Sequence, residues 1–171
     1  DDLNCMILRT SIEAGFHGLS GATVTTTHAK NAEEALGLLG DGPMCAYDVV
    51  VCDQHMETSG GVMKGTEFIS ALHKMYCQSR APVVVLASGN TDEADIEHYH
   101  ACGADVVWSK PYPSAPTLVG DVVAQLHKRQ SPPPAQQRKV VGPAESEQQT
   151  LERDGSLRNF FRVFSVLVPA V

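Results

Sequence analysis

The sequence lacks closely spaced cysteine pairs, an excess of basic residues and long apolar runs, and each absence argues against a class of protein. Its five cysteines include no Cys-x-x-Cys pair and are odd in number, which favours reduced thiols in an intracellular protein over a disulfide framework. It has 13 basic and 20 acidic residues, and the net charge of −7 argues against non-specific binding to nucleic acid or acidic membranes. No signal peptide is visible at the start, and no apolar run approaches the roughly 20 residues of a membrane span.

Helical and strand patterns alternate along the first 129 residues. Continuous apolar runs at 47–52 and 82–87 predict strands that are buried on both faces, and shorter strands are expected over 22–27 and 105–108. Helical spacing of apolar residues predicts helices over 3–17, 31–39, 66–75, 92–102 and 115–128. This alternation predicts an α/β fold in which helices cover both faces of a parallel sheet. Because the chain starts on a helix, the repeat looks as if its first strand were absent.

The composition changes past Arg129. Residues 130–159 are rich in Pro, Gln, Ser and Glu, which predicts a linker that is stiff over Pro132–Pro134 and disordered beyond. Residues 160–171, "FFRVFSVLVPAV", turn apolar again. We therefore expect a domain over 1–129, a linker over 130–159 and a short apolar tail over 160–171.

Polar residues follow the apolar strands. Asp53 ends the run 47–52, Ser88 follows "VVVLA", and Lys110 follows "DVVWS". Asp1 and Asp2 lie where a missing first strand would end. Parallel strands share a direction, so all five residues should gather at one edge of the sheet. Three clustered carboxylates repel one another without a cation, and Mg²⁺ is the ion that best suits a few carboxylates, waters and phosphate oxygens. A carboxylate held there can attack a phosphoryl group and form an aspartyl-phosphate.

At these motifs the chain resembles the receiver domain of two-component response regulators. The resemblance covers about residues 1–129 and rests on Asp1-Asp2, "VVVCDQHM" with Asp53, "VLASGN" with Ser88, and "WSKPY" with Lys110-Pro111. It implies a CheY-like, flavodoxin-like fold of three layers, with a five-stranded parallel sheet in the order 2-1-3-4-5. It also implies a protein that accepts a phosphoryl group from a histidine kinase or a histidine-phosphotransfer protein and is not otherwise an enzyme. The reduced thiols predict an intracellular location, cytoplasmic or nuclear.

The resemblance assigns a role to each motif residue. Asp53 would be the phosphoryl acceptor, and Asp1, Asp2 and Asp53 would bind Mg²⁺ together with the backbone carbonyl of His55. We expect the side chain of His55 to point to solvent and to tune hydrolysis of the phosphoryl group.

The remaining motif residues would sense the phosphoryl group. Ser88 and Lys110 would contact and stabilise it, and the Lys110–Pro111 peptide bond would be cis. The family often has an aromatic switch three residues before the lysine, where this sequence has the aliphatic Val107. Trp108, the next residue, is expected to be a core or helix-facing aromatic.

Two further departures concern the backbone. The loop after Asp53 has Glu57 where the family usually has proline, and the family's next glycine corresponds to Gly65, which indicates an insertion of about four residues. The absent first strand would occupy the middle of the sheet, where each buried aliphatic side chain contributes roughly 1.5–3 kcal/mol. Either the strand lies upstream of this chain or another segment fills its place, and residues 163–168, "VFSVLV", are the candidate.

Three functions remain open at this stage. The first is a Mg²⁺-dependent phospho-accepting module that switches the binding of a partner protein. The second is a phosphorylation-independent pseudo-receiver that acts as a protein-interaction module. In either case the chain could be part of a hybrid histidine kinase. The third, a phosphatase that uses an aspartyl-phosphate, is disfavoured because it needs an acid where this chain has His55.

Overall fold

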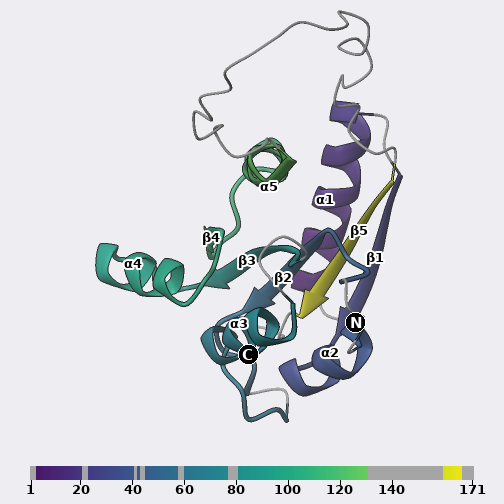
Figure 1. The fold of residues 1–171 in the computed structure, drawn as a ribbon. Coiled ribbons are helices and arrows are strands. Elements are labelled where there is room, and N and C mark those ends of the chain that lie inside the picture. Colours follow the sequence, from purple (N-terminus) through teal and green to yellow (C-terminus); the bar gives the residue numbers. More distant parts are fainter. Residues whose placement is uncertain are drawn as a thin grey trace, which may run out of the picture.

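The computed structural model alternates helices and strands along the chain (Figure 1). The structure describes residues 3–20, 23–40, 42, 45–57, 60–76, 81–130 and 160–166. The helices are α1 (Leu3–Ser20), α2 (Ala32–Leu39), α3 (Gly65–Met75), α4 (Glu93–Ala101) and α5 (Ala115–Gln130). The strands are β1 (Thr23–Ala29), β2 (Val49–Asp53), β3 (Val83–Ser88), β4 (Val106–Ser109) and β5 (Phe160–Val166).

The five strands form one parallel sheet in the order β1-β5-β2-β3-β4. This confirms the predicted α/β fold and its five-stranded parallel sheet. The strand next to the edge strand β1 comes last in the chain, whereas in the expected order 2-1-3-4-5 it comes first. The spatial arrangement is therefore the expected one, reached with a different chain order.

Strand β5 fills the position of the absent first strand. It pairs with β1 along its whole length, from Thr23↔Phe160 to Ala29↔Val166, and with β2 from Val49↔Val163 to Cys52↔Val166. The hypothesis that this apolar segment enters the sheet is confirmed, although the strand begins three residues earlier than predicted, and 167–168 lie outside the described residues. A segment that the composition assigns to a separate tail is thus a central element of the sheet.

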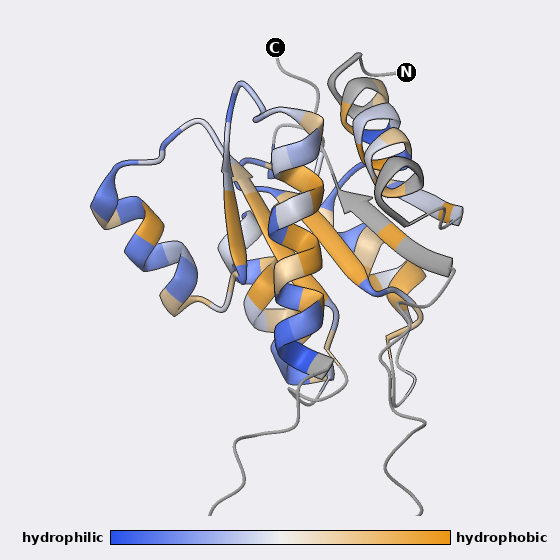
Figure 2. Ribbon diagram, turned by 90° about the horizontal axis from the view of Figure 1, so that it is seen from above, coloured by the Kyte–Doolittle hydropathy of each residue, from blue (hydrophilic) through white to orange (hydrophobic). Residues whose placement is uncertain are grey.

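Buried apolar side chains form one cluster on each face of the sheet, and Figure 2 shows the hydrophobic strands enclosed between helices. One cluster joins α2, α3 and α4 to the sheet and includes Val50, Phe68 and Tyr99. The other joins α1 and α5 to the opposite face and includes Phe16 and Val163. The fold is therefore the expected three-layer sandwich. None of the described helices combines the length and apolar composition of a membrane span.

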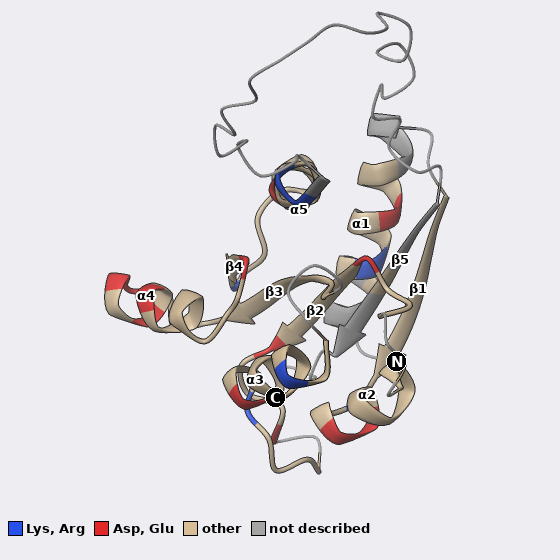
Figure 3. Cartoon of the chain, viewed as in Figure 1, with Lys and Arg blue, Asp and Glu red and all other residues tan. Residues whose placement is uncertain are grey.

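Two helices start with side-chain caps that fix where the neighbouring loops turn. Asn31 Oδ1 accepts a hydrogen bond from Glu34 N at 3.0 Å to open α2, and Asp92 Oδ1 accepts one from Asp95 N at 2.8 Å to open α4. Acidic residues occupy the first turn of both helices, as the red segments of α2 and α4 in Figure 3 show. Negative charge at the amino-terminal end of a helix interacts favourably with the helix dipole and so stabilises the helix.

Candidate functional site

Three predicted site residues meet at the carboxyl edge of the sheet. Asp53 is the last residue of β2, Ser88 is the last residue of β3, and Lys110 directly follows β4. Their strands are neighbours, with Asp53 level with Ala87 and Ser88 level with Ser109. Asp1 and Asp2 lie outside the described residues.

The carboxylate of Asp53 is almost completely buried and makes one hydrogen bond through each oxygen. Its Oδ2 accepts a hydrogen bond and ion pair from Lys110 Nζ, and its Oδ1 accepts a hydrogen bond from His55 N at 3.3 Å. The side chain of Asp53 is 6% exposed and that of Lys110 is 28% exposed, so the ammonium is the nearer of the two to solvent. Removing one partner of such a pair leaves an uncompensated charge, which is strongly destabilising.

Ser88 lies at the same edge of the sheet, at the end of the neighbouring strand β3, and is fully buried. Its Oγ accepts a hydrogen bond from Asn90 N at 3.0 Å and lies 3.2 Å from the hydroxyl of Tyr99 on α4. Its backbone carbonyl accepts a hydrogen bond from Lys110 N at 2.9 Å. This bond holds the start of the loop after β4 against the end of β3. The peptide bond between Lys110 and Pro111 is cis, the geometry that the resemblance implies.

His55 directs its side chain away from the acceptor. The side chain is 55% exposed, and its Nδ1 lies 3.4 Å from Glu57 Oε1. The pKa of Glu57 is lowered, first by a hydrogen bond from its own backbone N–H and further by His55 and Lys64. The backbone N–H of His55 is thus the group that contacts the carboxylate of Asp53.

Gly65 is the residue that the loop after Asp53 needs in order to return to the sheet. A Cβ at this position would lie 2.5 Å from the backbone oxygen of Asp53 and 2.6 Å from Leu86 Cδ1. Gly65 N donates to Gln54 O at 3.0 Å, and Thr66 N donates to Gln54 Oε1 at 3.1 Å. The assignment of Gly65 as the counterpart of the family's glycine agrees with this close approach.

Val107 at the switch position and the next residue, Trp108, face opposite sides of the sheet. Val107 is half-buried and packs against the cluster that contains Tyr99. Trp108 is buried in the other cluster, and its Nε1 donates to Asp121 Oδ2 on α5 at 3.3 Å. Trp108 is thus a helix-facing core residue, as the sequence predicts, and it does not face Ser88.

Two site residues are not predicted from the sequence. Tyr99 contacts Ser88 from α4, and Met56, in the loop after Asp53, is fully buried. Met56 has a sequence signal, since it is the one large apolar residue between Asp53 and Gly60. The signal for Tyr99 is that it is the largest side chain of a helix whose residues are mostly polar.

The donor chemistry at this edge fits a hard divalent cation. Each oxygen of Asp53 accepts one hydrogen bond from a described residue, so lone pairs remain for a metal ion. Among the described residues there is no group of three metal-ligating side chains, and the predicted ligands Asp1 and Asp2 are not among those residues.

Comparisons with known proteins identify the fold. No family model and no curated protein matches the sequence. The receiver domain of a Francisella response regulator is 25% identical with a TM-score of 0.55, over 75% of this chain and 93% of that one. An atypical orphan response regulator with a phosphorylation-independent regulatory mechanism is 24% identical with a TM-score of 0.51, over 71% and 87%.

A third similar structure contains the modification expected here. It is a response regulator from Burkholderia pseudomallei with a phosphorylated aspartic acid, a calcium ion and citrate; it is 16% identical, with a TM-score of 0.51, over 74% of this chain and 66% of that one. All of these proteins are response regulators, and their fold agrees with the one described above. The chain therefore has the CheY-like fold of response regulator receiver domains, in which the last strand of the chain takes the place of the first.

Proposed function

We propose that the chain is a phosphorelay receiver that accepts a phosphoryl group on Asp53 in the presence of Mg²⁺. The observation that carries this proposal is the contact between Asp53 and Lys110 at the carboxyl edge of the sheet, with Ser88 at the end of the adjacent strand. An anionic oxygen, an ammonium and a hydroxyl at one edge are the groups that phosphoryl transfer requires.

In the proposed reaction, one oxygen of Asp53 forms a bond to phosphorus as the P–N bond of a phosphohistidine donor breaks. The leaving imidazole takes up a proton, and the phosphoryl group stays on the carboxylate as an acyl phosphate. Lys110 neutralises charge on the transferring oxygens, and Ser88 donates a hydrogen bond to one of them.

Mg²⁺ would be held by Asp53, by the backbone carbonyl of His55 and by Asp1 and Asp2. When bound, it neutralises negative charge on the phosphoryl oxygens. The similar Burkholderia structure, with its phosphorylated aspartic acid and calcium ion, supports this part of the proposal by analogy of fold.

The donor would be a histidine kinase or a histidine-phosphotransfer protein, since the proposed reaction needs a phosphohistidine. Beyond accepting and hydrolysing its own phosphoryl group, the domain would be a switch for a protein partner and not an enzyme. The three free cysteines among the described residues, Cys45, Cys52 and Cys102, favour an intracellular location.

A pseudo-receiver that binds partners without phosphorylation is the second candidate. Two features favour it: the aliphatic Val107 at the switch position, and a similar structure whose regulatory mechanism is phosphorylation-independent. The intact set of Asp53, Ser88 and Lys110 favours the phospho-acceptor.

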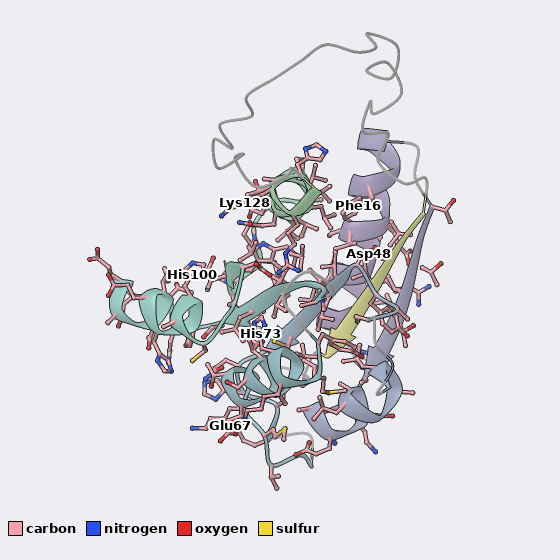
Figure 4. The ribbon with its side chains drawn as sticks, viewed as in Figure 1. Phe16, Asp48, Glu67, His73, His100 and Lys128 are labelled. Carbon is pink, nitrogen blue, oxygen red and sulfur yellow. The ribbon has the colours of Figure 1, made fainter. Side chains whose placement is uncertain are left out.

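The experiment is intact-mass spectrometry of the full chain after incubation with acetyl phosphate and Mg²⁺. We expect the wild type to gain the mass of one phosphoryl group, the Asp53→Asn variant to gain none, and chelation of Mg²⁺ to abolish the gain. Asp48→Asn is the matched control, because Asp48 directly precedes β2 at the end of the strand opposite Asp53 (Figure 4). An unmodified wild type would reject phospho-acceptance in favour of the pseudo-receiver.

A further inference from the structure

We infer that Tyr99 connects the state of the Asp53 site to the position of α4, through its hydrogen bond to Ser88. The inference rests on the proposed function, because it describes what the chain does once a phosphoryl group is present. It replaces an aromatic switch on β4 with a tyrosine on the neighbouring helix.

The two hydroxyls form a buried pair. Ser88 is fully buried, Tyr99 is 3% exposed, and their oxygens are 3.2 Å apart. Ser88 Oγ also accepts a hydrogen bond from Asn90 N. Among the described residues, Ser88 is the hydrogen-bond partner of the Tyr99 hydroxyl, so a change at Ser88 acts directly on Tyr99.

The topology places Asp53 and Tyr99 on opposite sides of Ser88. Strand β3 lies between β2, which ends in Asp53, and β4, against which α4 packs. A phosphoryl group on Asp53 adds strong acceptor oxygens on the β2 side. Either hydroxyl of the Ser88–Tyr99 pair can be the donor. In the inferred switch, the Ser88 hydroxyl moves toward the β2 side to donate its hydrogen to the phosphoryl group, and so moves away from Tyr99 on the β4 side.

Tyr99 cannot lose this partner without consequence, because a buried hydroxyl without a hydrogen bond is costly. Tyr99 is also the one residue of α4 that is buried. Figure 1 shows α4 at the end of the sheet, apart from the other helices, so this side chain is its main anchor in the core. A displaced Tyr99 therefore displaces the helix.

Contacts at the two ends of α4 indicate which part would move. After the helix, Gly103 O lies 3.1 Å from His73 Nε2 of α3, and Ala104 N donates to Tyr99 O at 3.1 Å. The first turn of the helix is exposed at Glu93 and Ala94. The helix should therefore pivot about its carboxyl end.

Val107 excludes the alternative in which β4 supplies the switch. It occupies the expected switch position three residues before Lys110, and it is half-buried in contact with the cluster that includes Tyr99. Its side chain has no polar atom and cannot exchange a hydrogen bond with Ser88. In this chain the hydroxyl that meets Ser88 comes from α4.

The test compares the full-length wild type with Tyr99→Phe, which keeps the ring and removes the hydroxyl. The probe is beryllofluoride with Mg²⁺, a mimic of the phosphoryl group; the measurements are its dissociation constant and amide hydrogen exchange of residues 93–101. We expect beryllofluoride to speed exchange in α4 of the wild type. In Tyr99→Phe, α4 should no longer respond, and beryllofluoride should bind about 2- to 10-fold more tightly because no Ser88–Tyr99 bond must break.

Tyr47→Phe is the matched control, since it removes a tyrosine hydroxyl that donates to Thr27 Oγ1, away from Ser88. It should behave as the wild type. Ser88→Ala removes the other hydroxyl of the pair and should also abolish the response of α4, so the inference does not depend on the folding of one variant.

The outcomes separate the two proposals. If the wild type binds beryllofluoride but α4 does not respond, or responds equally in Tyr99→Phe, the role of Tyr99 is rejected and the proposed function stands. If the wild type shows no binding that Asp53→Asn removes, the proposed function fails and this inference fails with it.

Discussion

At Gly65, the start of α3 lies close to the acceptor residue. Its missing side chain lets the first residue of α3 lie directly against the backbone of Asp53 and Gln54. A larger residue must push β2 and α3 apart, because the nearest atom is a backbone oxygen that has no freedom to rotate away.

Gly65→Ala should therefore destabilise the fold by about 1–3 kcal/mol, the usual cost of overpacking a well-packed site. Gly37→Ala is the control, since Gly37 lies within α2 where an added methyl group would meet no atom within 4 Å, and alanine should raise stability by about 0.5–1 kcal/mol. Urea denaturation of both variants measures these changes. Equal stability of Gly65→Ala and the wild type would contradict the close approach.

Cys52 precedes the acceptor and is fully buried within β2. Burial in apolar surroundings, with a smaller contribution from the charge of Asp53, raises the pKa of the Cys52 thiol well above its ordinary range. The thiolate is the reactive form, so this side chain should be inert in the folded protein.

In the folded chain at mildly alkaline pH, iodoacetamide should modify the half-buried Cys102 and leave Cys52 unmodified. Peptide mass spectrometry with and without denaturant gives the two extents of labelling. Rapid alkylation of Cys52 without denaturant would mean that β2 is not buried as described.

At the scale of elements, the loop after Asp53 is held by a carboxylate of α2. Glu33 Oε1 accepts hydrogen bonds from Val62 N at 2.9 Å and from Met63 N at 3.1 Å. A Cβ on Gly61 would lie 2.6 Å from Glu33 Oε2, so the loop approaches this side chain closely. The part of the loop at residues 62–63 is thus anchored to α2.

These hydrogen bonds give the loop a pH dependence. The one from Val62 N is the largest cause that lowers the pKa of Glu33 below its usual value of 4.5. A carboxyl group whose pKa is lower in the folded state stabilises that state above its unfolded pKa, and this stability is lost as the pH falls through the folded pKa. The loop should therefore loosen below about pH 4.5 and stay anchored at neutral pH.

Glu33→Gln should produce the same loosening at neutral pH, because an amide oxygen is a weaker acceptor than a carboxylate oxygen. We expect faster amide exchange at residues 60–64 and a loss of overall stability below about 1 kcal/mol, since the site is exposed. Glu93→Gln on α4 is the matched control. Unchanged amide exchange at residues 60–64 in Glu33→Gln would show that Glu33 does not anchor the loop.

At the scale of the whole molecule, β5 completes a sheet that the other four strands leave divided. It is the strand that joins β1 to β2, and Val163 in its centre is 1% exposed. Its neighbours on both sides belong to the part of the chain before residue 54, so the amino-terminal half of the fold depends on a distant segment.

Val163→Asp should destabilise the protein by at least about 3 kcal/mol, because it buries a charge without a partner. Thr25→Asp, at an exposed position on the edge strand β1, should change stability little. In the wild type, amide exchange at 160–166 should be nearly as slow as in β2. Exchange as fast as that of an unstructured peptide would show that β5 does not occupy the sheet.

Local sequence patterns predict most of this fold because the pattern and the structure depend on the same residues. The apolar runs that contain Val49–Val51 and Val83–Val85 are buried on both faces of the sheet, and the polar residues that follow them lie at its edge. The length and register of β5 are harder to predict, because any part of the apolar run 160–171 could satisfy the same pattern. The role of Tyr99 is not predictable in this way, because the face that a polar helix turns to the core is set by packing.

The most direct test of the central claim is to identify the modified residue chemically. After incubation of the full chain with acetyl phosphate and Mg²⁺, reduction with borohydride converts an aspartyl-phosphate to homoserine, which peptide mass spectrometry locates. The account predicts homoserine at position 53 and at no other acidic residue. An unmodified Asp53, or homoserine at another position, would contradict it.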